Sequence, residues 1–437
     1  MNRNEGPAAG SLAPDEGALQ QAPPGVELQR SSLRRNRDYL WWFAGDSAGH
    51  LATAMRTLAL SYLAFHLTGR ISSSGILGTT VAVTTIVVAI FGGAIVDRMD
   101  RRRAMVCYGI GGMVIWGSGA LLLLLGAMTF PLLLAVAFGS AVLGGIFGEA
   151  TNAALRSIVS TRDYPVAQAA NQGRDGAISV IGAPLGGALY TLRDWLPFVA
   201  PVICFALLAF SALRIKTDLY PRRGLVRGSS GVLRDIAEGF RYVIEHKRLL
   251  RVLVMMVFIN LGFSGLMTGM VLNLVNIGTS PVKVGLINTA VGISAILGSV
   301  VATKLVDRIP TGLLLVSISV IGVVVLSPLL ADQGYWTVLV TESIVMFLVP
   351  AVNAGIVGYA FALIPVELQG RVGSVTNLAN IFAAFSAAIG GWLLTVSSPA
   401  VCAAAFWSCV VIAALFVSSS KLLREIPTPE RWPEFPL

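Results

Sequence analysis

The sequence predicts an all-α integral membrane protein with twelve transmembrane helices in two pseudo-symmetric halves of six. Hydrophobic residues make up 55% of the 437 residues and charged residues only 13%, whereas soluble domains carry roughly a quarter charged residues. Apolar segments long enough to cross a bilayer, which takes about 20 residues for a helix, follow one another along the chain. Short motifs recur with an offset of somewhat more than 200 positions, which indicates an internal repeat.

The apolar segments are separated by short loops that carry charge, glycine or proline. The first six segments span residues 39–67, 74–96, 104–126, 130–155, 166–192 and 198–215. The second six span residues 252–278, 283–303, 311–330, 337–363, 372–396 and 399–420. We therefore divide the chain into a disordered cytoplasmic tail (1–37), an N-terminal six-helix bundle (38–215), a cytoplasmic connector (216–251), a C-terminal bundle (252–420) and a cytoplasmic C-terminal tail (421–437).

Basic residues are concentrated in every second loop. With the N-terminus inside, the outer loops keep only Arg70, Arg193 and Lys283, whereas the inner loops hold the basic clusters. This is the asymmetry of the positive-inside rule, so both termini are expected in the cytoplasm and the net charge of +9 is read as topology, not as nucleic-acid binding. The expected partners are the bilayer of the cell membrane and a small-molecule substrate, and the expected state is a monomer.

The connector contains a segment with helical amphipathic spacing. Apolar residues recur at Val232, Ile236, Phe240 and Ile244 between charged neighbours. We expect a helix that lies along the inner membrane surface.

Two motifs that recur in the second half support the internal duplication. Asp97 and Arg98 close the second segment, and Asp307 and Arg308 close the eighth. The glycine pair 186–187 in the fifth segment has a counterpart at 390–391 in the eleventh. Parallel repeats of this kind place a substrate site between the halves near the membrane midplane, which is the geometry of a carrier.

The loop after the second segment resembles the signature of the major facilitator superfamily. The matching residues are Gly93, Asp97, Arg98, Arg101 and Arg102, and Asp307 with Arg308 forms a degenerate second copy. The resemblance implies the major facilitator fold and a gating latch that closes in the outward-facing state. The alternative is a basic cluster that only sets topology.

Two further motifs resemble exporters of this superfamily. Gly182, Pro184, Gly186 and Gly187 resemble the antiporter signature of the fifth helix, with Ala183 in place of the usual glycine. The stretch from Pro365 to Arg371 and the entry to the first helix resemble the branch of siderophore and macrolide exporters. Close helix packing by small residues is an alternative reading of the glycines, and the two readings are compatible.

Polar residues form stripes on several predicted helices, and in the first helix Asp46, His50, Thr53 and Thr57 fall on one face. Ionisable groups within a bilayer are functional candidates by default. Our candidates for substrate binding and proton coupling are Asp46, His50, Arg56, Glu149, Asn152, Arg156, Asp175, Glu342 and Asn353. Alternatives remain: Glu149 with Arg156 can be a structural ion pair, Asp175 with Arg174 can be interfacial, and His50 can be a structural histidine.

These observations together predict a proton-coupled antiporter that exports a small amphipathic molecule, such as a drug, a macrolide or a siderophore-like product. An importer or uniporter of the same fold is the alternative, followed by a membrane sensor. No HExxH or Walker sequence occurs in the chain, and the sequence predicts neither an enzyme nor an ATP-driven pump. No metal or organic cofactor is expected, and the expected coupling ion is the proton.

Overall fold

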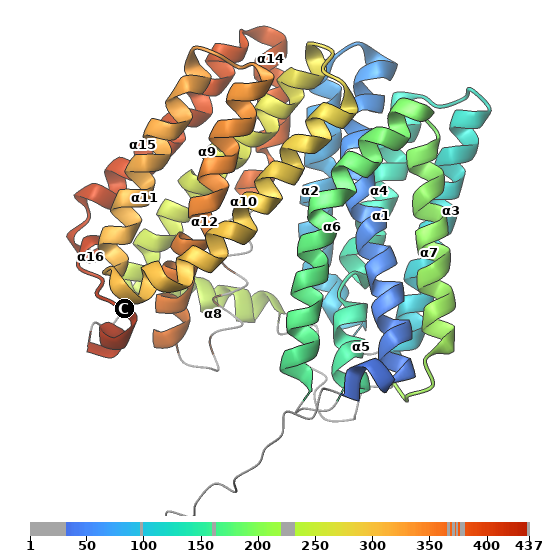
Figure 1. The fold of residues 1–437 in the computed structure, drawn as a ribbon, viewed down its shortest axis with the longest axis horizontal. Helices are drawn as coiled ribbons and strands as arrows, with labels where there is room; N and C mark the ends of the chain where they lie inside the picture. Colours follow the sequence, from blue (N-terminus) through green and yellow to red (C-terminus); the bar gives the residue numbers. More distant parts are fainter. Residues whose placement is uncertain are drawn as a thin grey trace, which may run out of the picture.

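The computed structural model of the chain describes residues 32–96, 99–159, 163–219, 232–364, 368, 372, 375 and 381–434. Every regular element within these residues is helical (Figure 1). Backbone hydrogen bonds inside a helix satisfy the peptide groups without water, which is the requirement for crossing a bilayer.

The first half forms seven helices that match the first six predicted spans. They are α1 (Arg37–Thr68), α2 (Ile71–Val96), α3 (Arg101–Leu124), α4 (Phe130–Phe147), α5 (Ala150–Ile158), α6 (Tyr164–Leu192) and α7 (Leu196–Arg214). A short 3₁₀ helix (Ser32–Arg35) precedes α1, and the side chain of Asn36 caps α1 by accepting from two of its first N–H groups. The fourth predicted span differs from the prediction because it is divided into α4 and α5 at Gly148.

The second half begins with the amphipathic helix of the connector, α8 (Val232–Glu245). The membrane helices that follow are α9 (Lys247–Asn276), α10 (Pro281–Arg308), α11 (Thr311–Leu326) with a 3₁₀ turn (Ser327–Leu330), α12 (Tyr335–Leu363), α14 (Ser386–Val396) and α15 (Pro399–Ser419). The chain continues through the short α16 (Lys421–Arg424) and a 3₁₀ helix, η4 (Pro429–Glu434).

Nine helices within the described residues are long and apolar enough to cross a membrane. Three of the twelve predicted spans are not among the nine: the first and fifth, which are the long helices α1 and α6, and the eleventh, which is described only in part. Within their length α1 and α6 carry the charged residues Asp46, Arg56, Arg174 and Asp175. A helix that faces a polar site loses hydropathy for that reason.

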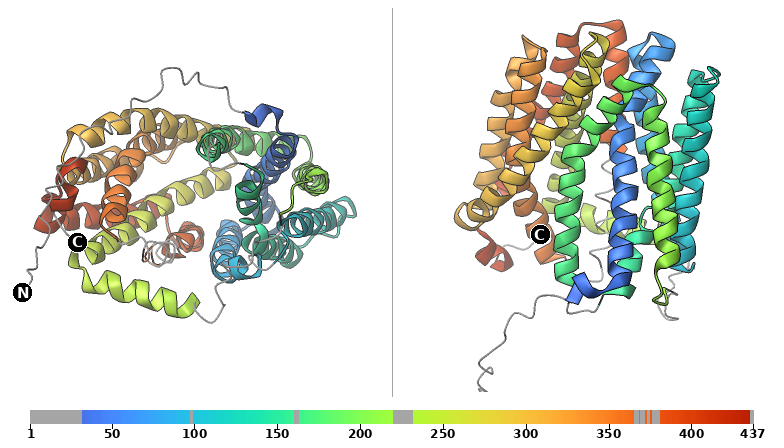
Figure 2. Two further views of the ribbon diagram at one scale, coloured as in Figure 1. Left: turned by 90° about the horizontal axis from the view of Figure 1, so that it is seen from below. Right: turned by 45° about the vertical axis from the view of Figure 1, so that its right-hand side comes forward.

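The two halves stand side by side as separate bundles (Figure 1) and surround a central axis when viewed from below (Figure 2). We call the end of the molecule at which α1 begins the near end, and the end at which α2 begins the far end. The main contacts between the halves join α6 to α10 and α2 to α14.

The described hydrogen bonds between the two bundles lie toward the far end. Tyr62 Oη donates to Thr279 O at 2.6 Å, and Thr289 Oγ1 donates to Val180 O at 2.5 Å. Thr79 Oγ1 donates to Ala384 O at 2.9 Å and accepts from Ala388 N at 2.9 Å. The halves are therefore joined at the far end, and α8 lies beside their near ends (Figure 1).

Glycines of α6 allow this helix to approach two neighbours closely. A Cβ atom on Gly186 would lie 2.1 Å from Met55 O of α1, and one on Gly187 would lie 2.5 Å from Pro281 O of α10. The second pair behaves alike, because Gly390 faces Gly269 of its own bundle and Gly391 faces Ser72 of the other bundle. Each glycine pair thus packs one residue within its half and one across to the other half, as expected for a duplicated fold.

Candidate functional site

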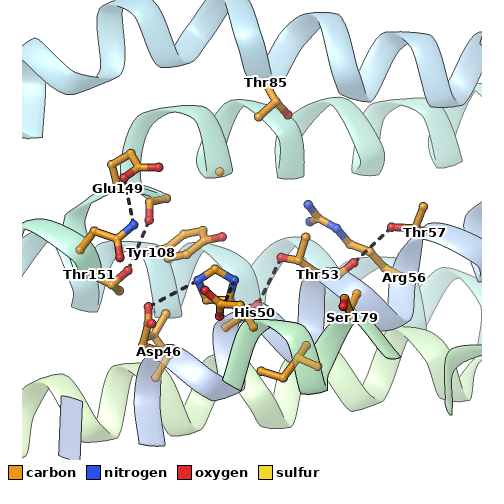
Figure 3. Close-up of a pocket in the computed structure, with 18 residues that line it drawn as sticks. Asp46, His50, Thr53, Arg56, Thr57, Thr85, Tyr108, Glu149, Thr151 and Ser179 are labelled. Carbon is orange, nitrogen blue, oxygen red and sulfur yellow. Dashed lines mark hydrogen bonds and ion pairs between the residues drawn. The ribbon is translucent and has the colours of Figure 1, made fainter. Parts of the chain in front are cut away.

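A cavity of about 420 Å³ lies inside the first bundle (Figure 3). Its lining comes from α1, α2, α3, α4, α5, α6 and α7, and α1 contributes the most residues. The polar lining residues are Asp46, His50, Thr53, Arg56, Thr57, Thr85, Tyr108, Glu149, Thr151, Asn152, Asp175 and Ser179. The structure therefore brings six of the nine predicted site residues to one cavity.

The predicted stripe on α1 lines this cavity. Asp46, His50, Thr53 and Thr57 follow one another at intervals of three or four residues, so their side chains project from one face of the helix. Asp46 is buried, with its side chain 2% exposed, whereas the side chain of His50 is 43% exposed. The stripe thus runs from an enclosed carboxylate to an accessible imidazole.

Arg174 of α6 connects the ionisable groups of the two helices. Its Nη2 atom lies 2.6 Å from Asp46 Oδ2 and 2.8 Å from Asp175 Oδ1. The guanidinium also lies over the rings of Trp42 and Phe43, at 5.9 and 5.2 Å from their centroids. These contacts neutralise a buried carboxylate and hold the arginine over aromatic faces.

His50 lies between the two carboxylates of this cluster. Its Nε2 atom is 3.8 Å from Asp46 Oδ1, and its Nδ1 atom is 3.8 Å from Asp175 Oδ1. A neutral imidazole at this distance needs only a small movement to hydrogen-bond either carboxylate, and a protonated one is attracted by both. The four residues form a chain of ionisable groups from α1 to α6.

A second cation lies deeper along α1. The guanidinium of Arg56 donates to Ser140 Oγ of α4 and stacks 5.5 Å from the ring centroid of Trp116 on α3. The side chains of Tyr108 and Thr53 are joined by a hydrogen bond nearby. Arg56 is therefore held in place by groups from two other helices.

Glu149 lies at the junction of α4 and α5 and is exposed to the cavity. Its Oε2 atom accepts from Asn152 Nδ2 at 3.0 Å. The side chain of Arg156, the predicted alternative partner, lies outside the described residues.

The candidates from the second half are not part of this cavity. Glu342 on α12 is completely buried, and no described residue forms a hydrogen bond with either of its carboxylate oxygens. Asn353, further along α12, is exposed. This cavity therefore lies within the first half, and a site shared by both halves stays a prediction.

The gating motif is only partly described. Gly93 belongs to α2, whereas Asp97 and Arg98 lie outside the described residues. Arg101 Nη1 donates to Ser157 Oγ at 2.5 Å, and Arg102 Nη2 donates to Thr217 O at 2.9 Å. Both bonds stay within the first bundle.

The second copy of the motif and the second exporter motif lie in the other half. Asp307 and Arg308 are exposed at the near end of α10. The stretch from Pro365 to Arg371 lies outside the described residues except for Leu368.

The predicted site residues did not include Arg174 and Tyr108, nor the lining residues Thr85 and Thr151. The signal for Arg174 was an arginine directly before Asp175 within an otherwise apolar helix, but its position off the predicted stripe concealed its role. Tyr108 gave no signal, because a single tyrosine in an apolar helix is common. Among the described residues no group of three or more histidine, cysteine, aspartate or glutamate side chains is placed to hold a metal ion.

Comparisons with known proteins place this architecture in a family. The model of the Major Facilitator Superfamily matches residues 47–387. No curated protein matches the chain.

Several solved structures share the fold. A bacterial homologue of the iron transporter ferroportin, in an inward-facing state, is similar with a TM-score of 0.68 at 15% identity and covers 89% of this chain and 99% of its own. A bacterial homologue of the human lysosomal transporter Spinster, inward-facing and unoccupied, has a TM-score of 0.62 at 13% identity and covers 92% and 98%. A D-xylose–proton symporter has a TM-score of 0.62 at 14% identity and covers 90% and 99%.

The family match spans most of the chain, and the neighbours are transporters that share its helical architecture. The chain therefore belongs to the major facilitator superfamily and is a multi-pass membrane transporter, not an enzyme.

Proposed function

We propose that this transporter is a proton-coupled antiporter that exports a small amphipathic molecule by alternating access. The observation that carries the proposal is the position of His50, which lies 3.8 Å from the carboxylates of both Asp46 and Asp175 in the cavity. An imidazole between two carboxylates is placed to pass a proton to either of them.

The cluster gives a simple exchange of charge. Asp46 is held by Arg174 in a largely enclosed ion pair, whereas His50 and Asp175 have side chains that are 43% and 44% exposed. The accessible members can exchange a proton with water while the enclosed pair keeps α1 and α6 together. A substrate that enters the cavity lies beside His50 and changes the solvation and charge around it, which couples substrate binding to the proton.

The cavity suits a small amphipathic substrate. Its volume of about 420 Å³ falls within the range of roughly 300–1,000 Å³ that is typical of ligand pockets. Ala54, Ile178 and Leu208 supply apolar lining beside the polar residues. A ligand with one polar and one apolar part would be complementary to both surfaces.

Alternating access is supported by the uneven joining of the halves. The described hydrogen bonds between the bundles lie toward the far end, so rocking of the bundles would separate this end and close the near end. In that closed state Arg101 and Arg102, whose described bonds now stay within the first bundle, would become available to acids of the second half. We assign the near end to the cytoplasm from the distribution of basic loops.

Export is the proposed direction because the glycines at 182, 186 and 187 resemble the antiporter signature. The glycines also pack α6 against α1 and α10, and this packing and an antiport role are compatible. For export, the substrate would enter the cavity while the near end is open and would leave after the far end has opened.

The experiment is transport in proteoliposomes under an imposed pH gradient, with ethidium and a cationic macrolide as probes. His50→Gln and Asp175→Asn are expected to abolish gradient-driven accumulation while substrate exchange between equal pH values continues. His66→Gln and Asp194→Asn, which lie at the far end outside the cavity, are the matched controls.

Each result has a defined meaning. Proton movement opposite to that of the probe supports antiport, and proton movement in the same direction would replace the proposal with import by symport. Gradient-driven accumulation that survives both substitutions would refute the role of His50 and Asp175.

A further inference from the structure

The C-terminal segment after α15 is packed into the second bundle at the near end. Leu423 is completely buried, Ile426 is 2% exposed and Trp432 is 8% exposed. These side chains belong to one apolar cluster with residues of α9, α11, α12 and α15. Residues 421–434 of the expected C-terminal tail (421–437) are therefore packed as part of the fold.

The segment provides the missing cap of α11. The N-cap position of α11 is Pro310, which forms no side-chain hydrogen bond to the helix. Instead, Thr311 N donates to Pro427 O at 3.2 Å and Gly312 N donates to Ile426 O at 2.9 Å. The first N–H groups of any helix lack partners within the helix, so these two carbonyls supply from a distant segment what a local cap would supply. Gly312 is required here because a Cβ atom would lie 2.2 Å from Arg424 O.

Trp432 joins this cap to α12. Its Nε1 atom donates to Thr311 Oγ1 at 3.2 Å and to Pro427 O at 3.1 Å. Its ring packs edge-on against Tyr359 of α12, with centroids 5.9 Å apart. A Cβ atom on Gly358 would lie 2.9 Å from the same ring. One side chain thus connects the start of α11 with the near-end part of α12.

The first half has a corresponding arrangement after its sixth membrane helix. Thr217 N and Oγ1 donate to Asp38 Oδ2 at 2.7 and 2.6 Å, and Thr217 O accepts from Arg102 of α3. In the second half Ser420 Oγ accepts from Arg251 Nη1 at 2.8 Å, at the start of α9. In both halves, therefore, the chain that leaves the last helix links the near ends of the first and third helices. The second half has, in addition, a link through Trp432 to its fourth membrane helix, α12.

We propose that residues 421–434 form an intramolecular clasp that fixes the near ends of α11 and α12 and so positions the loop at Asp307 and Arg308 for closure against the first half. The loop enters α11 at Pro310, directly before the two residues that the clasp holds. The positioning role rests on the proposed alternating access, whereas the clasp itself does not. Trp432 is the positioning residue of the clasp.

The first test measures the clasp without transport. Hydrogen exchange of the full chain in detergent is compared for the wild type, Trp432→Ala and Trp432→Phe. Trp432→Ala is expected to speed exchange at Thr311 and Gly312 about tenfold, which corresponds to the loss of about 1.4 kcal/mol. Trp432→Phe, which keeps a ring against Tyr359, is expected to recover part of the protection. Trp336→Ala is the matched control, since Trp336 is 73% exposed near the far end.

The second test measures positioning. Spin labels at Arg103 and Lys304, both exposed near-end positions, report the distance between the halves in a cysteine-free background. Trp432→Ala is expected to broaden the short-distance population and to slow transport, with recovery in Trp432→Phe. Unchanged exchange at Thr311 and Gly312 would overturn the clasp. Faster exchange with an unchanged distance distribution would overturn its positioning role, whatever the coupling ion proves to be.

Discussion

The guanidinium of Arg174 on α6 lies 2.6 Å from the carboxylate of Asp46 on α1, and the two side chains are only 7% and 2% exposed. The same arginine reaches the more exposed Asp175 at 2.8 Å. The enclosed guanidinium of Arg174 thus contacts one enclosed carboxylate, that of Asp46, and one accessible carboxylate, that of Asp175. In the proposed mechanism, this arrangement would separate the holding of two helices from the exchange of protons.

Removal of Arg174 is expected to destabilise the protein more than removal of the whole pair. Arg174→Ala leaves Asp46 as an unpaired buried charge, a loss that typically costs about 3–5 kcal/mol. The double variant Arg174→Ala with Asp46→Ala removes that charge and is expected to recover part of the loss. Thermal unfolding in detergent measures both, with Arg193→Ala, an exposed arginine that follows α6, as the control. A double variant no more stable than Arg174→Ala would contradict this account.

The two adjacent glycines of α6 are expected to have different phenotypes. Gly186→Leu would collide with α1 in the same bundle and should lower thermal stability, whereas Gly187→Leu would collide with α10 of the other bundle and should shift the carrier away from the far-closed conformation. Gly173→Leu is the control, because no atom lies within 4 Å of a Cβ there. Unfolding temperature and far-end label distances separate the two effects. If the two variants had the same unfolding temperature and the same label distances, this would contradict the account in which Gly186 packs within its own half and Gly187 packs against the other half.

Thr79 is expected to stabilise the joined far end. Its hydroxyl both donates to Ala384 O and accepts from Ala388 N across the two halves, and a net hydrogen bond contributes about 0.5–1.5 kcal/mol. Thr79→Val should therefore shift the conformational equilibrium several-fold toward the far-open state. Thr80→Val is the matched control, since Thr80 Oγ1 bonds only to Ile76 O of its own helix. Equal label distances in the two variants would show that Thr79 does not bias the equilibrium.

Glu342→Gln is expected to leave the stability of this conformation unchanged. An ionised carboxylate that is completely buried without a described hydrogen-bond partner would be costly, and glutamine has the same shape without charge. The unfolding temperature should therefore change by less than about 2 °C, the shift expected for less than about 1 kcal/mol. Asp46→Asn provides the contrast, because it leaves Arg174 without its enclosed partner. A large loss of stability in Glu342→Gln would show that the ionised form is needed.

Transport by the same variant has a separate meaning. If Glu342→Gln folds normally but no longer transports, Glu342 must ionise in another conformation of the cycle. If transport is unchanged, Glu342 is not the proton-coupling group. Measurement of transport at several pH values in the folded variant distinguishes these outcomes.

Much of the fold follows from sequence because the bilayer imposes a simple rule. A span needs about 20 apolar residues and satisfies its own backbone, so apolar segments map directly to helices. The twelve predicted spans therefore agree with the helices to within a few residues where the structure describes them. The break between α4 and α5 was not predicted, since Gly148 interrupts no apolar pattern.

The candidate site could be predicted only in part. Helical periodicity placed Asp46, His50 and Thr53 on one face of α1, and in the structure these three residues line one cavity. Periodicity describes a single helix, however, and could not show which face of α6 meets α1. Arg174 was consequently left aside, although it joins Asp46 to Asp175.

The sequence by itself determined the class of protein, the order of its helices and the duplication, because these depend on hydrophobic length and on short motifs within one segment. Only the tertiary structure decided which charges meet, that the cavity belongs to the first half, and that the segment ending at Trp432 caps α11. These features arise from contacts between residues far apart in the chain, such as Thr311 and Trp432. Such contacts depend on how helices are rotated and packed against one another, which local hydropathy does not encode.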